Sequence, residues 1–206
     1  YTLLRNAGHQ VYGIDLVNRP QWSGTYLAYV VARWLFRWKL GCLSLGAGQT
    51  LVCGDVGHLP FPDNAFDLVT SVAALEHFMD LTGVVSELHR VLRPGGLVYV
   101  RIHLFSCPSG GHNVRTTEIP LQILPDGVDP WDHLRKRRLP FHVPLNEWRN
   151  YQYLAEFQKH FEILKHYCAM REGEHLLTPQ IERELANYSR DELTCGAYVI
   201  VARKPS

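Results

Sequence analysis

Two apolar runs in the first half of the chain predict a pair of buried strands. Residues 51–53 form a short apolar run that ends at Gly54 and Asp55, and residues 66–72 form a longer run rich in β-branched side chains. Runs without a polar face are typical of strands that are covered on both sides, as in a parallel sheet. The residues between the two runs include prolines, aspartate and asparagine, which favour turns. The pattern therefore predicts an α/β fold.

Helical periodicity and stop signals predict the elements that precede these strands. Residues 2–7 are interpreted as the end of a helix that stops at Gly8, and residues 9–14 as a strand that ends at Asp15. Residues 25–40 carry an apolar stripe at helical spacing. The stripe consists of Leu27, Val30, Val31, Trp34, Leu35 and Trp38.

The second half of the chain continues the alternation of helices and strands. The pattern of residues 81–92 predicts a helix that ends at a Pro-Gly-Gly turn. The pattern of residues 97–104 predicts the strand that follows. Residues 161–169 and 196–202 predict two closing strands. Signals for helix N-termini occur at Asp80 or Thr82, at Asn146, at Thr178 before Pro179, and at Ser189 with Glu192.

The segment that holds the two apolar runs, residues 51–77, resembles the class I S-adenosylmethionine-dependent methyltransferases, in particular the broad methyltransferase type 11 family. The shared pattern is GD-x-x-x-LPF-x-D-x-x-FD-x-V, here Gly54, Asp55, Leu59, Pro60, Phe61, Asp63, Phe66, Asp67 and Val69. The resemblance continues through residues 75–77 and 87–96, and covers about the first half of the chain. Each motif alone is common, but together they are specific.

The resemblance implies a doubly wound, mostly parallel, Rossmann-like sheet whose antiparallel last strand is inserted between its neighbours. Six strands are expected in residues 1–206, as a single domain. The family's first strand and its glycine-rich loop are expected upstream of Tyr1, so the chain is interpreted as incomplete at its N-terminus. Residues 43–48 look like that loop, but only seven positions separate Gly48 from Asp55, too few for a crossover helix.

The resemblance also implies S-adenosyl-L-methionine as the cofactor. An acidic residue at the end of a strand, Asp15 with the neighbouring Leu16, would accept the ribose hydroxyls, as in dinucleotide folds. A turn or helix cap is the alternative role for Asp15. The other implied cofactor residues are Gly54, Asp55 at the adenine amino group, Val56 against the ring, and Ser71, Ala73, Ala74 and Leu75 along the methionine side.

Histidines near the predicted strand ends are candidates for catalysis. Because the carboxyl ends of parallel strands meet at one edge of a sheet, Glu76, His77 and His103 are expected around one crevice. A histidine can take a proton from a hydroxyl acceptor, and we predict His77 and His103 for this role. The predicted substrate residues are Glu76, His112, Trp131 and His133. A hydrogen-bonding histidine of the core or a loop is the alternative in each case.

Residues 106–144 form a long segment with few regular patterns, and such segments are often functional. Its aromatic, histidine and arginine content favours an element that covers the substrate. The alternative is a surface excursion packed by its own Trp131 and Leu134.

Composition limits the possible partners. A net charge of +1 gives no reason to expect a nucleic-acid partner. The basic run at residues 135–138 is interpreted as a solvated face, with a phosphate-binding patch as the alternative. Five cysteines without a C-x-x-C pair favour a reducing, cytoplasmic location and argue against structural zinc. Because the spacing of His103, His112, His133 and His142 matches no ligand pattern, no metal site is predicted.

No apolar run approaches the ~20 residues that span a bilayer. The predicted helix at residues 25–40 is interpreted as packing on the sheet or covering the cofactor cleft. Its tryptophans and basic residues leave peripheral contact with a membrane as the alternative.

The predicted function is therefore methyl transfer to an oxygen, nitrogen or carbon atom of a small molecule. A nicotinamide-dependent oxidoreductase is one alternative, since it would share Asp15 but would not need residues 55–67. A relic of the fold that only binds is another. The identity of the acceptor does not follow from the sequence, because one fold serves many reactions.

Overall fold

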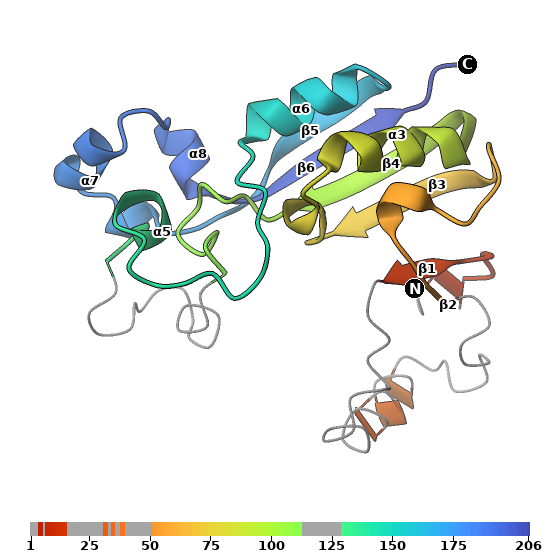
Figure 1. Ribbon diagram of the computed structural model, residues 1–206, viewed down its shortest axis with the longest axis horizontal. Helices are drawn as coiled ribbons and strands as arrows, with labels where there is room; N and C mark the ends of the chain where they lie inside the picture. Colours follow the sequence, from red (N-terminus) through yellow and green to blue (C-terminus); the bar gives the residue numbers. More distant parts are fainter. Residues whose placement is uncertain are drawn as a thin grey trace. The chain divides into compact units, whose positions relative to one another are not determined.

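The computed structural model describes residues 4–5, 7–15, 31–32, 34–35, 38–39, 51–112 and 129–206. The chain divides into two compact units, Tyr1–Pro60 and Phe61–Ser206. Each unit is described by itself, and Figure 1 gives the labels of the elements.

The first unit holds a two-stranded parallel sheet. Strand β1 (Gly13–Asp15) pairs with β2 (Leu51–Cys53), and Asp15 stands opposite Cys53. The predicted strand at residues 51–53 is confirmed, whereas the strand predicted from residue 9 is paired only from Gly13. Upstream, Leu4 and Arg5 are helical, and Gly8 has a φ of +88°, which is typical of a helix C-terminus.

The helix predicted for residues 25–40 is present where it is described. Residues 31, 32, 34, 35, 38 and 39 are helical. Four apolar side chains of the predicted stripe are between 47% and 62% exposed, namely Val31, Trp34, Leu35 and Trp38. The other stripe residues, Leu27 and Val30, lie outside the described residues, as do Leu16 and the predicted loop at residues 41–50.

The second unit is built on a four-stranded sheet in the order β3-β4-β6-β5. Strand β3 (Phe66–Val72) is parallel to β4 (Leu92–Ile102). The last strand, β6 (Cys195–Arg203), lies between β4 and β5 (Glu162–Arg171) and is antiparallel to both. The predicted insertion of an antiparallel last strand is therefore confirmed.

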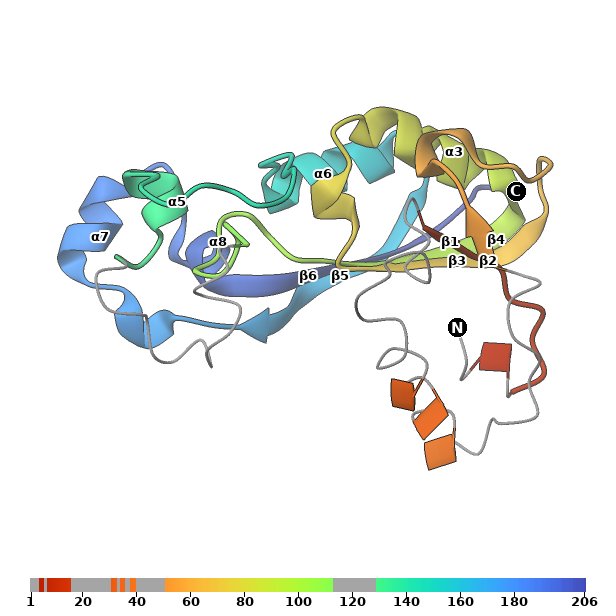
Figure 2. The same ribbon diagram turned by 60° about the horizontal axis from the view of Figure 1, so that its bottom comes forward.

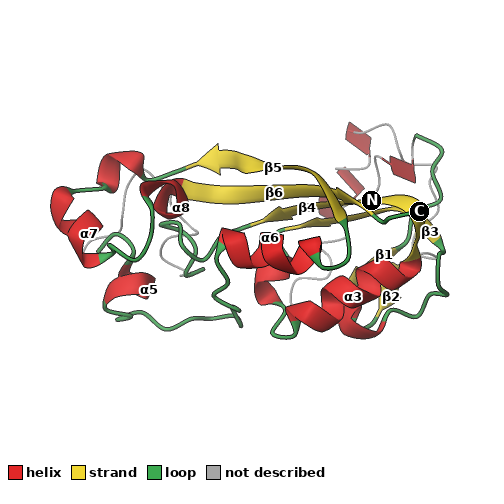
Figure 3. Cartoon of the chain, turned by 90° about the horizontal axis from the view of Figure 1, so that it is seen from above, coloured by secondary structure: helices red, strands yellow, loops and turns green. Residues whose placement is uncertain are grey.

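Helices α3 (Leu81–Val91) and α6 (Asn150–Gln158) cover one face of this sheet, as Figures 2 and 3 show. Alternate residues of β4 explain the two faces. On one face, the side chains of Val98, Val100 and Ile102 are fully buried. Leu97 precedes Val98 in the strand, belongs to the opposite face, and is 37% exposed. The buried residues of α3 recur at the predicted positions, Leu81, Val84, Val85, Leu88 and Val91.

Short helices gather beyond the far end of β5 and β6. They are α5 (Asp132–Arg135), η4 (Glu174–Leu176), α7 (Pro179–Glu184) and α8 (Arg190–Thr194). A small hydrophobic cluster joins them, made of Trp131, Ile181, Leu185 and Leu193. The predicted caps at Thr178 and Ser189 are confirmed, because each side chain accepts a hydrogen bond from the third residue after it.

Three predictions need correction. The six predicted strands form two sheets, of two and four strands, and not one sheet. The strand β4 begins at Leu92 and not at the predicted residue 97. Leu92 pairs with Phe66, residues 93–96 bulge, and pairing resumes at Leu97. Helix α6 begins at Asn150, four residues after the predicted cap, because Asn146 is engaged elsewhere by its side chain.

The basic run at residues 135–138 is paired with acids. The four side chains contact carboxylates of Glu184, Asp129 and Glu147. The side chains of Lys136, Arg137 and Arg138 are 43–58% exposed and fit the solvated-face interpretation, whereas that of Arg135 is only 8% exposed. Among the described helices, none has the length and hydropathy that a bilayer span requires. The described cysteines, Cys53, Cys107, Cys168 and Cys195, are free thiols.

Candidate active site

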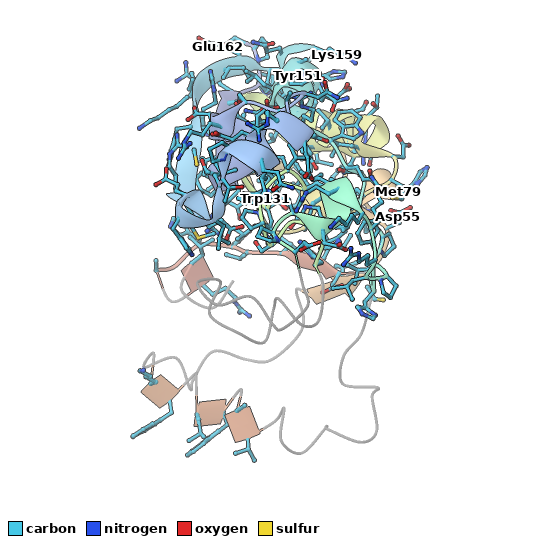
Figure 4. The ribbon with its side chains drawn as sticks, turned by 90° about the vertical axis from the view of Figure 1, so that its left-hand side faces the viewer. Asp55, Met79, Trp131, Tyr151, Lys159 and Glu162 are labelled. Atoms are coloured by element: carbon cyan, nitrogen blue, oxygen red, sulfur yellow. The ribbon has the colours of Figure 1, made fainter. Side chains whose placement is uncertain are left out.

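The first unit presents two carboxylates at the carboxyl ends of its strands. Asp15 ends β1, and its backbone oxygen accepts a hydrogen bond from Gly54 N at 3.0 Å. Asp55 follows β2 and caps the short helix η2 (Val56–His58). Its Oδ1 accepts from Gly57 N at 2.8 Å, and this hydrogen bond, with His58 beside Oδ2, lowers the pKa of the carboxyl. The side chain of Asp55, labelled in Figure 4, is 64% exposed.

The carboxyl end of β3 in the second unit carries the residues predicted for the methionine side. Ser71 is half-buried, and Ala73 turns the chain with a φ of +50°. Because residues with a Cβ rarely adopt that conformation, this turn stores strain of about 1–3 kcal/mol. A hydrogen bond of 2.8 Å from Ala73 N to Arg101 O ties the turn to β4. Leu75 then begins the short helix η3 (Leu75–His77) and is buried.

Asn146 holds the η3 turn in place. Its side-chain Nδ2 donates to Leu75 O at 2.7 Å and to Phe78 O at 3.0 Å, and its backbone N donates to Glu76 O at 2.9 Å. Its Oδ1 accepts from the hydroxyl of Tyr153 on α6 at 2.7 Å. Asn146 therefore fixes the backbone from which Glu76 and His77 project.

Four side chains meet at the ends of β3 and β4, and we call Glu76, His77, His103 and His112 the histidine cluster. One ligand atom each of Glu76, His103 and His112 lies within 4.8 Å of the others. The ring of His112 is 4.6 Å from that of His103 and 4.9 Å from that of His77, measured between centroids. The sequence-based expectation that Glu76, His77 and His103 share one region is met, and His112 joins them.

A chain of hydrogen bonds leads from Glu172 to His112. Ser109 Oγ lies 2.6 Å from Glu172 Oε1 and 2.7 Å from His103 Nε2, and His103 Nδ1 lies 2.8 Å from His112 Nε2. A carboxylate oxygen accepts, so Ser109 donates its single proton to Glu172 and accepts from His103. The Nδ1 atom of His103 then carries a lone pair and accepts from His112 Nε2.

The tautomer of His77 follows from the same reasoning. Its Nδ1 lies 2.9 Å from Pro144 O, and a carbonyl oxygen only accepts. The Nδ1 atom therefore carries the proton of the neutral ring, and Nε2 keeps a lone pair that is able to bind a proton or a metal ion.

Burial shifts the pKa values of the cluster toward neutral side chains. Burial raises the pKa of Glu76, which is 2% exposed, and neighbouring charges and backbone N–H groups only partly oppose it. Burial is also the main cause that lowers the pKa of His103, and it lowers that of His112 to about 4. The lowered pKa values favour the unprotonated imidazoles of His103 and His112 at neutral pH.

Two predicted substrate residues lie in the packed interior. Trp131 is 1% exposed in the hydrophobic cluster of the short helices, and its indole N–H points between Ser106 O and Leu193 O, at 3.0 and 3.1 Å (Figure 4). His133 is buried, and its Nε2 donates to Phe105 O at 2.7 Å. Trp131 thus packs against the short helices, and His133 bonds to the backbone of Phe105.

Sequence reasoning missed Asn146, Ser109 and Glu172. Asn146 looked like a helix cap, but its side-chain Nδ2 donates to carbonyl oxygens of Leu75 and Phe78, 71 and 68 positions away. Ser109 and Glu172 are 63 positions apart, and no motif links them. Only the fold brings them to the histidines.

Solved structures show the fold class. A structure described as an S-adenosylmethionine-dependent methyltransferase from Listeria monocytogenes superposes with a TM-score of 0.56 at 15% identity. The superposition covers 100% of this chain and 86% of that one. The fold is thus that of the class I methyltransferases.

Sequence comparison agrees over the first half of the chain. Residues 1–100 match the family model described as a methyltransferase domain. A sterol 24-C-methyltransferase of Gibberella zeae is 41% identical over 78 residues, 37% of this chain. A demethylmenaquinone methyltransferase of Staphylococcus epidermidis is 50% identical over 48 residues, 23% of this chain. Each match spans 20% of the relative's own length. Over residues 1–100 the chain thus resembles the methyltransferase domain family in sequence, and its fold is that of the class I methyltransferases.

Proposed function

We propose that this protein binds S-adenosyl-L-methionine and transfers its methyl group to an oxygen atom of a small molecule. The observation that carries the proposal is the histidine cluster, which offers an unprotonated imidazole nitrogen where β3 and β4 end. A base matters most for a hydroxyl acceptor, because the hydroxyl must lose its proton to become a good nucleophile.

The described residues fit the cofactor. The Asp55 side chain is 64% exposed, and its carboxylate, which caps η2 through Oδ1 and lies 3.4 Å from His58 Nδ1 through Oδ2, has further lone pairs for the adenine amino group. Asp15, at the end of β1, suits the ribose hydroxyls, and Gly54 and Val56 flank Asp55. For the methionine side we propose Ser71, Ala73, Ala74 and Leu75, which follow one another at the end of β3.

His77 is the proposed general base. Its Nδ1–H is held by Pro144 O, so the ring is oriented and Nε2 is left to take the acceptor's proton. When bound, the cofactor supplies the methyl carbon, whose bond to sulfur breaks as the bond to the acceptor oxygen forms. His103 is engaged at both nitrogens and is better suited to positioning His112 than to direct proton transfer. Glu76 and His112 are the proposed acceptor contacts, and Trp131 and His133 would support the surrounding segment.

The test is methyl transfer by the full-length protein with a His77→Gln variant. Labelled S-adenosyl-L-methionine would be offered with hydroxylated acceptors, among them a sterol and a quinol because of the two named relatives. We expect kcat of His77→Gln to fall about 10²–10⁴-fold, with unchanged affinity for S-adenosylhomocysteine. His175→Gln, an exposed histidine of η4, is the matched control and should retain full activity. Equal turnover of both variants would contradict the role of His77.

A further inference from the structure

We infer that Glu76, His103 and His112 form a binding site for a divalent transition-metal ion of the zinc or iron(II) type. One carboxylate and two imidazoles are a ligand set that such ions commonly accept. Their candidate ligand atoms lie within 4.8 Å of one another. Tetrahedral bonds of ~2.1 Å place donors ~3.4 Å apart, so the widest pair would have to close by at most ~1.4 Å.

The Glu76 carboxylate supports the site independently. Both of its oxygens are buried and lack a hydrogen-bond partner of good geometry among the described residues, although the side chain is only 2% exposed. Backbone N–H groups of Glu76 and His103 lie near the carboxyl without satisfying it. A buried carboxyl without partners is costly, and a bound cation removes that cost.

The hydrogen-bonded chain prepares His103 as a ligand. Its Nε2 proton is held by Ser109, which Glu172 orients, so Nδ1 presents its lone pair toward His112. Metal-binding histidines are usually oriented in this way: the ring nitrogen that does not bind the metal donates its proton to a carboxylate or to another acceptor. An ion between the two rings would take the place of the proton on His112 Nε2. That proton would move to Nδ1 of the same His112 ring, which changes its tautomer. The charge on His112 is unchanged by this shift.

A second group of potential ligands, His103, Cys107 and Glu172, is a weaker candidate. Ser109 already bridges His103 and Glu172 by two short hydrogen bonds. Burial and the neighbouring Glu172 raise the pKa of the fully buried Cys107 thiol well above its ordinary value, which opposes the thiolate that a metal requires. The ion would therefore bind at His103 Nδ1, on the side of the ring that faces Glu76 and His112.

Metal binding itself does not depend on the proposed methyl transfer. Its further role does: the ion would bind the acceptor oxygen and lower the pKa of the hydroxyl, so that His77 Nε2 takes the proton more readily. His77 remains beside the site through its ring contact with His112.

The test is titration of the chelator-treated, full-length protein with Zn²⁺ by calorimetry, without cofactor or acceptor. We expect one ion per chain, with binding at least ~100-fold weaker in Glu76→Gln and His112→Asn, and ~10–100-fold weaker in Glu172→Gln. Asparagine suits position 112 because His112 has a φ of +46°, which asparagine tolerates. His175→Asn is the matched control and should bind like the wild type.

Histidine-ring ¹⁵N resonances of the wild type provide a readout that needs no variant. With one equivalent of Zn²⁺ the signals of His103 and His112 should move and that of His175 should stay. Absence of stoichiometric binding, or unchanged affinity in Glu76→Gln with unmoved His103 and His112 signals, would overturn the site. Binding of S-adenosylhomocysteine is measured separately without metal, so that failure of the methyltransferase proposal is distinguishable from failure of the metal site.

Discussion

Single residues far apart in the sequence determine the geometry of the histidine cluster. Asn146 binds both ends of the η3 turn, and Glu172 orients His103 through Ser109. Polar residues with several short hydrogen bonds near a buried site define one conformation of that site, and removing one of them leaves its partners unsatisfied. The cluster therefore depends on residues that take no part in chemistry.

Replacement of Asn146 tests this dependence. Asn146→Ala leaves Leu75 O, Phe78 O and the Tyr153 hydroxyl without their partner, so we expect the free energy of unfolding to fall by about 2–4 kcal/mol. Urea unfolding measures the change. Asn150→Ala is the control, because among the described residues the Asn150 side chain bonds only the backbone N of Tyr151, and it should change stability by less than about 0.5 kcal/mol. Equal effects would show that Asn146 does not hold the turn.

At the scale of elements, the ends of helices and strands are joined by buried ion pairs and tight turns. Arg149, which caps α6, forms two 2.7 Å hydrogen bonds with Glu192 in α8. The strand β5 ends at Arg171, and the chain turns at Gly173, which has a φ of +69° and lies against Pro108. These joints determine where the second unit presents Glu172.

The Arg149–Glu192 pair predicts a pH dependence of stability. Burial opposes ionisation of Glu192, but its bonds to Arg149 and to Ser189 outweigh burial and lower its pKa in the folded protein below the ordinary value of 4.5. The unfolded chain therefore binds the proton first, so this contribution to stability is complete above about pH 5.5 and is lost as the pH falls through 4.5 and below.

Unfolding free energies of the wild type and Glu192→Gln measure this contribution. We expect the variant to be less stable by about 1.5–3 kcal/mol at pH 7, because it loses hydrogen bonds to a charged group. The difference should shrink below pH 4.5. A difference that is constant down to pH 3.5 would contradict the assigned pKa direction.

Alanine substitutions at two glycines distinguish backbone strain alone, at Gly95, from strain combined with a steric clash, at Gly173 after β5. Gly95→Ala places a Cβ in open space at a φ of +75° and should cost about 1–2 kcal/mol. Gly173→Ala has similar strain, and its Cβ would also clash with Pro108 Cγ, so we expect a loss of about 3 kcal/mol or more. Thermal unfolding of the two variants compares them. Equal losses would exclude the close approach to Pro108.

Sequence patterns predicted the elements better than their assembly. The apolar face of α3 and the caps of α7 and α8 follow from local periodicity and turn chemistry, whereas the inserted strand β6 was expected from the family resemblance, and the structure confirms all of them. The division into two sheets and the engagement of Asn146 depend on long-range pairing, which local patterns do not contain. The proposed metal site was not predicted, because Glu76, His103 and His112 meet only when β3, β4 and the following loop are folded.

At the scale of the whole molecule, the protein combines two kinds of site residue. The first unit carries the acidic strand ends that we propose for the adenosyl group, Asp15 and Asp55. The second unit carries the histidine cluster that we propose for the acceptor and the metal ion. The two named relatives share sequence with this chain over only 20% of their own length, so the acceptor is to be identified by experiment on this protein.

The most direct test of the central claim is calorimetric titration of the full-length protein with S-adenosylhomocysteine and, separately, with NAD(H). We predict binding of S-adenosylhomocysteine at least ~100-fold tighter than that of NAD(H), and a loss of ~10-fold or more in Asp55→Ala, since a hydrogen bond to a carboxylate is worth about 1.5–3 kcal/mol. Asp191→Ala, which removes an exposed carboxylate paired with Arg171, should bind like the wild type. Tighter binding of NAD(H) would contradict the assignment as a methyltransferase, and unchanged affinity in Asp55→Ala would contradict the proposed adenine contact.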